Sequence, residues 1–475
     1  LLCYYTFMEQ ITKYHTMKDN QVAILTTFYS VDNAYSLCNV VEDQLKMFTM
    51  HGYKIKLFVD EGLDEKTLKG VWKHPNITFV KFMKVERSNE GKLKENFQEE
   101  SNALYAQLKE LLKDVKVVIA HDIVLQSAHI IHNLACRRVA QERPDLRWIH
   151  WAHSATSAKV PCSDETASAV IGQKFPNSIV AYPNDWDKKR VAQNWGYELD
   201  EVKTVHHPSD FLELMFGKEI DFSIYPSLSE EDKNKLDKEI NYPIRLTKDL
   251  VNEFDILNAD VIVAYPCRLD RGKQPEFLIK TMAKMKDLGR TVRCILFDFH
   301  STGDDKLVYK EELQRTAMEW GLTPHEMIFV SKWREDTHLS VPREVVMNIK
   351  KISDFHMHPS TSETYSLVVQ ESMIWKNLCV LNHHFPPMRD IYGSKNVLYE
   401  EFGSAVNSLT GENGATNINI YDQPKHFENL ANRILYHIEV ANPVINQWRF
   451  IRQTKSLKYI FRTQLEPLLY ELKVN

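Results

Sequence analysis

Two glutamates eight residues apart, Glu363 and Glu371, flank a predicted helix start and could bind a ligand rich in hydroxyl groups. The residues just before them, 353–358, predict a short strand, and the apolar residues from Leu367 onward have helical spacing. Glu363 is therefore expected in a strand-to-helix loop and Glu371 about two turns into the helix. A helix start presents free backbone N–H groups and positive potential, which suit a phosphate. Carboxylates accept hydrogen bonds from sugar hydroxyls, so the segment predicts a site for a phosphorylated sugar.

Two cations five residues apart, Arg268 and Lys273, occupy a loop upstream of these glutamates. The preceding run, 260–266, is apolar and rich in β-branched residues, which predicts a strand. Pro275 marks the start of the following helix and Gly289 its end. Open α/β sheets bind ligands at the carboxyl ends of their strands, where this loop is expected. Arg268 and Lys273 could therefore stabilise the negative charge of a bound phosphate.

Together, the two segments resemble the signature of family 4 of the retaining glycosyltransferases, which have the GT-B fold. Glu363 and Glu371 match the family's E-x7-E element, and Arg268 and Lys273 match its R-x4-K element; the resemblance is best over residues 258–395. It implies transfer of a sugar from a nucleotide-diphosphate sugar to a hydroxyl acceptor, with retention of configuration. It also implies that neither a metal ion nor another cofactor is needed.

The resemblance assigns roles to these residues and to their neighbours. Arg268 and Lys273 are expected to neutralise the departing diphosphate, and Glu363 to bind hydroxyls of the donor sugar. The other donor-binding candidates fall into three groups. Glu371 is expected to bind the ribose, and the helix start at Thr364, Tyr365 and Ser366 is expected to bind phosphate. Val330 and Ser331, at the end of a predicted strand at 327–331, are expected to contact the nucleotide base.

A histidine in the first half of the chain, His153, is the remaining catalytic candidate. It ends a predicted strand and is similar in position to a family histidine that lies beside the donor sugar. A neutral imidazole can hydrogen-bond a sugar hydroxyl, although a histidine at a strand end is also commonly structural. The acceptor-binding candidates are His121 and Asp122, which follow a predicted strand at 115–120, and Asn33, which follows the first strand.

Two loops depart from the family pattern. The family usually has glycines after its first strand and a G-x-G turn after the strand equivalent to 294–297. Residues 29–33 and 298–300 replace these glycines here. The sequence therefore does not predict close approach of the backbone to phosphate at these loops, although Asn33 can adopt a positive φ.

Strands and helices alternate along most of the 475 residues, which are too many for a single core. One of the expected helices spans 121–140. The alternation predicts an α/β fold with doubly wound parallel sheets. The resemblance adds the GT-B architecture, in which two Rossmann-like domains face each other across a cleft and a C-terminal helix crosses back to the first domain. The predicted units are an acceptor-binding domain at 17–210 completed by the helix at 444–475, a helical linker at 211–254, and a donor-binding domain at 255–443.

Composition argues against several other classes of protein. A net charge of −5 gives no general attraction to nucleic acid or to anionic membranes. The seven cysteines are scattered without a C-x-x-C pair, which favours reduced thiols and a cytoplasmic location. No run reaches the roughly 18 apolar residues of a membrane span, and residues 1–16 lack a signal-peptide pattern. The histidine pairs at 356/358 and 383/384 lack clustered cysteines or carboxylates, so no metal site is predicted.

Other interpretations remain open. The glutamates could be solvated helix residues, and the cations could simply balance Asp270. An epimerase or a phosphorylase of related fold would share the phosphate site, but an acid/base pair or a cofactor lysine is not recognisable. The presence of Arg268, Lys273 and Glu363 together argues against a catalytically silent sugar-nucleotide-binding protein. The acceptor could be a glycan, a small molecule or a hydroxymethylated nucleic-acid base.

Overall fold

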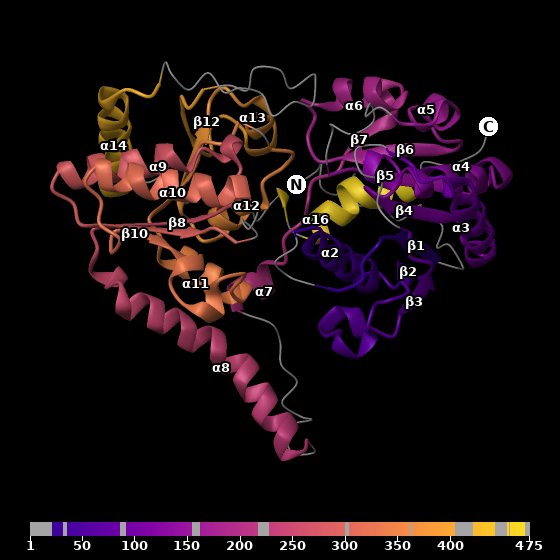
Figure 1. Cartoon of the computed structure of the whole chain (residues 1–475), viewed down its shortest axis with the longest axis horizontal. Helices are drawn as coiled ribbons and strands as arrows, with labels where there is room; N and C mark the ends of the chain where they lie inside the picture. The colour runs from indigo at the N-terminus through magenta and orange to yellow at the C-terminus, as the bar shows by residue number, and fades with distance from the viewer. Residues whose placement is uncertain are drawn as a thin grey trace, which may run out of the picture.

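The computed structural model of the chain describes residues 21–31, 36–85, 92–153, 162–216, 228–299, 304–361, 363–403, 421–441, 454–455 and 457–470. Its strands form two separate sheets, one of seven strands and one of six. Helices flank each sheet, and the two layered units lie beside each other (Figure 1). The prediction of two doubly wound α/β domains is confirmed.

The first sheet has the strand order β3-β2-β1-β4-β5-β6-β7, and all of its strand pairs are parallel. Strands β4, β5 and β6 are buried along their whole length, because helices cover both faces of the sheet and leave no solvated side. The strands are β1 (Gln21–Leu25), β2 (Lys54–Asp60), β3 (Ile77–Phe82), β4 (Val117–His121), β5 (Arg147–Trp151), β6 (Ser178–Tyr182) and β7 (Val202–Thr204). The helices are α2 (Ser36–Met50), α3 (Phe97–Leu111), α4 (Ile130–Glu142), α5 (Glu165–Ile171) and α6 (Lys188–Trp195).

The second sheet has the order β10-β9-β8-β11-β12-β13 and is also parallel throughout. Strands β8 and β11, which precede the two segments with predicted chemistry, are neighbours at its centre. The strands are β8 (Val261–Pro266), β9 (Val292–Phe297), β10 (Met327–Phe329), β11 (Phe355–His358), β12 (Leu378–Asn382) and β13 (Leu398–Glu400). The helices are α9 (Pro275–Asp287), α10 (Asp304–Glu319), α11 (Arg343–Ile352), α12 (Leu367–Ile374), α13 (Pro386–Tyr392) and α14 (Pro424–Glu439).

Two helices, α7 (Phe211–Phe216) and α8 (Glu230–Glu253), connect the sheets. The Ser229 hydroxyl caps α8 by accepting a hydrogen bond from the Asp232 N–H at 3.1 Å. Acidic residues fill the first turn, where negative charge suits the helix dipole. The N-terminal half of α8 extends beyond the second domain (Figure 1).

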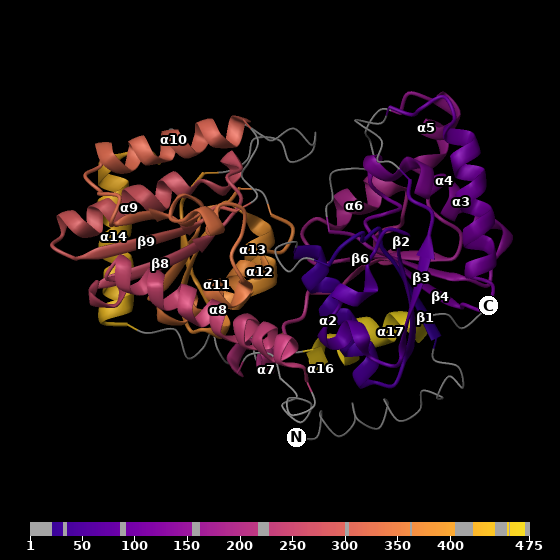
Figure 2. The same cartoon turned by 60° about the horizontal axis from the view of Figure 1, so that its bottom comes forward.

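The C-terminal helices return to the first domain, as the GT-B resemblance implies. Helix α16 (Leu457–Ile460), a π-helical turn (Phe461–Leu465) and α17 (Glu466–Tyr470) pack into the core around β1 and β2. The Phe461 ring lies against Phe48 and Tyr53, with centroids 5.7 and 5.9 Å away. Figure 2 shows these helices, in yellow, beneath the indigo strands of the first sheet.

Two local predictions are wrong. The helix expected at 121–140 begins only at Ile130, because His121 ends β4 and Asp122 adopts a left-handed conformation with φ 51° that turns the chain away. The strand expected at 327–331 ends at Phe329, and residues 330–332 form a 3₁₀ turn.

Candidate functional site

An ion pair joins the two segments that carry the predicted chemistry. Lys273 lies in a 3₁₀ turn after β8, and Glu363 lies in the loop between β11 and α12. The Lys273 Nζ atom donates a hydrogen bond to Glu363 Oε1. Their side chains are only 17% and 16% exposed. The structure therefore brings together two of the predicted catalytic residues, which are 90 positions apart, at the carboxyl edge of the second sheet.

Hydrogen bonds to backbone carbonyls hold these two loops together. Gln274 is buried in a left-handed conformation with φ 49°, and its Nε2 atom donates to the carbonyls of Pro359 (2.6 Å) and Phe402 (3.0 Å). The Thr361 N–H donates to the Gly272 carbonyl at 2.8 Å. The position of Lys273 is thus fixed by its neighbours on both sides.

A second basic side chain, His358, adjoins the carboxylate of Glu363. His358 is the last residue of β11, and its Nε2 atom lies 3.2 Å from Glu363 Oε1. Burial alone would raise the pKa of Glu363, but Lys273 and His358 outweigh it and lower the pKa to about 2. Glu363 is therefore ionised at neutral pH and can accept hydrogen bonds from hydroxyl groups. Sequence analysis did not find His358 as a site residue, because its proximity to Glu363 depends on the loop conformation.

The other predicted cation, Arg268, lies apart from this pair. Its side chain is 64% exposed, and its Nε atom lies 3.6 Å from Asp270 Oδ2. Lys306 also lies near Asp270, at 3.3 Å. Cations of this region therefore do neutralise Asp270, which is one of the interpretations that the sequence left open. The exposed side chain of Arg268 remains accessible to a ligand.

The start of α12 follows a tight left-handed turn that contacts the first domain. Ser366 precedes the helix in a left-handed conformation with φ 65°. The Thr364 carbonyl accepts a hydrogen bond from Asn184 Nδ2 of the first domain at 2.8 Å. Because the helix begins at Leu367, Glu371 lies about one turn into it, and the prediction of two turns is wrong.

The side chain of Tyr365 is buried against the first domain. Its hydroxyl donates to Gln370 Oε1 at 2.6 Å, and its oxygen lies 3.1 Å from the His207 carbonyl. The Gln370 Nε2 atom donates to the same His207 carbonyl at 3.2 Å. Tyr365 could therefore contribute its backbone to a donor site, whereas its side chain joins the two domains.

Two cations of α11 hold the carboxylate of Glu371. Arg343 Nη2 donates to Oε1 at 2.7 Å, and Lys350 Nζ donates to Oε2 at 2.9 Å. Burial alone would raise the pKa of Glu371, but the two cations outweigh it and lower the pKa. Sequence analysis missed Arg343 and Lys350, because only the packing of α11 against α12 brings them to Glu371.

The residues expected at the nucleotide base, Val330 and Ser331, lie in the turn after β10. Val330 is fully buried. The Ser331 hydroxyl donates to Asp298 Oδ2 and accepts from Lys310 Nζ, both at 2.6 Å. Asp298 is the first residue of the loop that lacks the G-x-G glycines, and its carboxylate also pairs with Lys310 at 2.6 Å. A buried Asp–Lys–Ser network thus fixes a loop that glycines shape in the family.

Three of the predicted residues of the first domain lie together. The His153 N–H donates to Asp122 Oδ1 at 2.8 Å, and the rings of His121 and His153 stack with centroids 5.3 Å apart. His207, which the sequence analysis missed, stacks on the other side of His153 at 5.1 Å. The fourth candidate, Asn33, lies outside the described residues.

The histidine cluster and the loop before α12 meet at the interface between the domains. The ring of His207 contacts the ring of Tyr365, with centroids 4.8 Å apart. The carboxyl ends of β4 and β5 in the first sheet thus face the α12 start in the second domain, so that a ligand between the domains could contact both groups.

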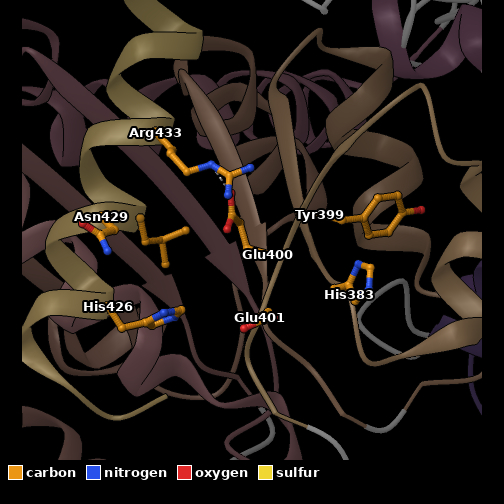
Figure 3. A pocket seen from close by; sticks show the side chains of 8 residues that line it. His383, Tyr399, Glu400, Glu401, His426, Asn429 and Arg433 are labelled. Carbon is orange, nitrogen blue, oxygen red and sulfur yellow. Dashed lines mark ion pairs between the residues drawn. The ribbon is translucent and has the colours of Figure 1, made fainter. Parts of the chain in front are cut away.

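A cavity of about 290 Å³ lies elsewhere, at the ends of β12 and β13 beside α14 (Figure 3). In Figure 3, Arg433 points at Glu400, with which it forms an ion pair at 3.0 Å. The cavity contains none of the predicted site residues; it is lined by His383, Tyr399, Glu400, Glu401, His426, Asn429, Leu430 and Arg433. We do not assign a function to it.

Two further properties concern the described part of the chain. It contains no group of three or more histidine, cysteine or acidic side chains arranged to hold a metal ion. None of its helices is both long and apolar enough to cross a membrane.

The fold is that of GT-B glycosyltransferases of known structure. The Anabaena protein HepE, solved in complex with UDP and glucose, is 15% identical to this chain, covers 95% of it with 100% of its own length, and gives a TM-score of 0.58. A glycosyltransferase from Rickettsia africae is 11% identical and covers 96% with 100% of its length at a TM-score of 0.61. Sucrose-phosphate synthase from Thermosynechococcus elongatus is 11% identical and covers 95% with 98% of its length at 0.59. The sequence matches no protein-family model and no curated protein.

Proposed function

We propose that the chain is a retaining glycosyltransferase that transfers a sugar from a nucleotide-diphosphate sugar to a hydroxyl acceptor without a metal ion or another cofactor. The observation that carries this proposal is the half-buried Lys273–Glu363 pair at the carboxyl edge of the second sheet. The complex of HepE with UDP and glucose supports a nucleotide-sugar donor, because that protein has the same fold. The scattered free thiols favour a cytoplasmic location.

The charges of the site suit the bond that would break. Departure of the diphosphate places negative charge beside Lys273, Arg268 and the start of α12, which stabilise it. Preorganised charges of this kind commonly contribute several kcal/mol. Glu363 binds hydroxyls of the donor sugar, and Glu371 binds the ribose diol. As the resemblance to retaining glycosyltransferases implies, Glu363 acts as a hydrogen-bond acceptor and not as a covalent nucleophile, and the acceptor attacks on the face that the diphosphate leaves.

The test is a panel of UDP-, GDP- and ADP-sugars, with donor hydrolysis followed by release of the nucleoside diphosphate. Turnover is expected with one class of donor, in the presence of EDTA. Lys273→Met and Glu363→Gln should each lower it by at least a hundredfold. Lys284→Met is the matched control, because Lys284 is a half-buried lysine of α9 that pairs with Asp287 and lies over the Trp320 ring, neither of which belongs to the predicted site.

Full turnover in either site variant would contradict the proposed roles, and no turnover by the wild-type chain with any donor would contradict the activity. Once an acceptor is found, NMR of the product decides the stereochemistry. An inverted anomeric centre would exclude the retaining mechanism.

A further inference from the structure

A row of hydrogen-bonded side chains leads from α2 to His153. Gln44 Oε1 lies 2.8 Å from His121 Nε2. His121 Nδ1 lies 3.0 Å from His153 Nε2. Gln44 and His121 are buried, and His153 is half-buried at the end of β5. The three side chains thus connect a buried residue of α2 with a predicted catalytic residue.

The order of donors and acceptors in this row follows from its chemistry. Burial lowers the pKa of His121 well below its usual value and that of His153 to about 3, so each ring is neutral at neutral pH and carries one N–H. The amide oxygen of Gln44 can only accept, so His121 carries its proton on Nε2. His121 Nδ1 must then accept, and His153 carries its proton on Nε2. His153 Nδ1 is left with a lone pair.

The surroundings of His153 fix its orientation as well. Its ring lies between those of His121 and His207, with centroids 5.3 and 5.1 Å away, and both neighbours are nearly parallel to it. Its backbone N–H is held by Asp122 at 2.8 Å. A flip of the ring would break the 3.0 Å contact between its Nε2 atom and His121 Nδ1, so that contact defines the direction of its Nδ1 lone pair.

A buried glutamine at position 44 would destabilise the fold if it served only to fill space. Its side chain is fully buried, and within the described residues its Nε2 atom has no hydrogen-bond partner. An unpaired buried amide is costly, and an apolar side chain of similar length would avoid that cost. The acceptor oxygen facing His121 is therefore the feature that accounts for a glutamine at this position.

We propose that Gln44 is a positioning residue that holds His153 in its Nε2–H tautomer, so that Nδ1 accepts a hydrogen bond from a hydroxyl of the donor sugar. The contact with the sugar rests on the proposed function. The tautomer does not, and it can be measured without a substrate.

The tautomer is tested by imidazole ¹⁵N chemical shifts of the protein labelled with ¹⁵N-histidine, with the His153 signals assigned by their loss in His153→Asn. The wild type is expected to show a single Nε2–H form. Gln44→Met, which keeps the length but loses the acceptor, should show a mixture of tautomers. Gln44→Glu, which can still accept, should restore the single form. Thr49→Val is the control, because Thr49 lies on the same helix and its hydroxyl bonds only helix carbonyls.

Turnover gives the second measurement. Gln44→Met should lower kcat/KM for donor hydrolysis about tenfold, the cost of one hydrogen bond. An unchanged single tautomer in Gln44→Met would overturn the proposal. If that variant does not fold, His121→Phe replaces it, because phenylalanine keeps an aromatic ring beside His153 but has no Nδ1 atom. A His153 tautomer that stayed single in His121→Phe would also overturn the proposal. Failure of the wild type to use any sugar nucleotide would overturn the sugar contact together with the proposed function, whereas the shifts would still decide the tautomer.

Discussion

At the scale of single residues, Glu363 is a largely buried carboxyl group that stays ionised. Burial opposes its ionisation, but Lys273 and His358 lower its pKa from 4.5 to about 2. A carboxyl group with a lower pKa in the folded chain than in the unfolded chain stabilises the fold when it is ionised. That stabilisation is complete above pH 4.5 and is lost as the pH falls towards 2. A shift of this size corresponds to about 3 kcal/mol.

Glu363→Gln is therefore expected to lower the free energy of unfolding by about 3 kcal/mol at pH 7, and by progressively less below pH 4.5. Urea unfolding at a series of pH values between 7 and 3 measures this difference. The exposed Glu344 provides the control, because Glu344→Gln should have little effect at any pH. A difference between Glu363→Gln and the wild type that did not change from pH 7 to pH 3 would show that the carboxylate is not stabilised by its ion pair.

Lys350 offers a second test at this scale, because it is a fully buried cation paired with Glu371. Removing one member of a buried pair leaves the other charge without full compensation, at a cost of about 3 kcal/mol. Lys350→Met should lower the free energy of unfolding by that amount in urea. Lys351→Met is the matched control, since Lys351 is the next residue and its Nζ atom lies over the Trp375 ring and donates a hydrogen bond to Asn348 of the same helix at 3.3 Å. Equal stability of the two variants would contradict a structural role for the pair.

The sequence was sufficient to find Lys273 and Glu363, because each lies in a short motif that follows a recognisable strand. It could not find Arg343, Lys350 or His207, which reach the site only through packing between helices and between domains. Nor could it predict that Tyr365 turns its side chain towards the first domain. A motif defines which residue types occur near a strand end, whereas side-chain direction depends on contacts with distant segments.

At the scale of elements, the loops after parallel strands carry the site, and polar residues shape several of these loops. The strands were predictable from apolar runs, because the helices leave no solvated face. The loop conformations were not. Asp122 and Gln274 adopt left-handed conformations that favour glycine, and Asp298 forms a buried network with Lys310 and Ser331. Such conformations depend on tertiary hydrogen bonds that local sequence does not reveal.

Gln274 tests this point. Gln274→Ala keeps the left-handed strain but loses the hydrogen bonds to Pro359 and Phe402, so the free energy of unfolding should fall by about 2 to 3 kcal/mol. Turnover should fall at least tenfold, because the loop no longer holds Lys273 against Glu363.

Gln274→Gly separates the two causes, since glycine relieves the strain without restoring the hydrogen bonds. It should be more stable than Gln274→Ala in urea and just as slow in donor hydrolysis. Wild-type turnover in the glycine variant would mean that the two hydrogen bonds do not position the catalytic pair.

At the scale of the whole molecule, polar contacts join the two domains next to the site. Asn184 donates to the Thr364 carbonyl, and Gln370 Nε2 donates to the His207 carbonyl. Asp390 of α13 accepts from the backbone N–H groups of Asp185 (2.5 Å) and Trp186 (3.3 Å). These contacts are directional hydrogen bonds. They can therefore break and form again as the domains separate and close around a ligand.

Asp390→Ala should accordingly shift the chain towards an open arrangement, because it removes the acceptor for two N–H groups across the interface. Small-angle X-ray scattering should show a larger radius of gyration than the wild type when no ligand is present, and a sugar nucleotide should reduce the difference.

Asp422→Ala is the matched control, because Asp422 pairs with Lys280 within the second domain. An identical radius for Asp390→Ala and Asp422→Ala would show that Asp390 does not hold the domains together. A larger radius that a bound nucleotide failed to reduce would show that closure does not depend on the donor. If the radius does fall, the bound donor bridges the two domains in place of the hydrogen bonds that the variant lacks. Domain closure and donor binding would then depend on the same surface between the domains.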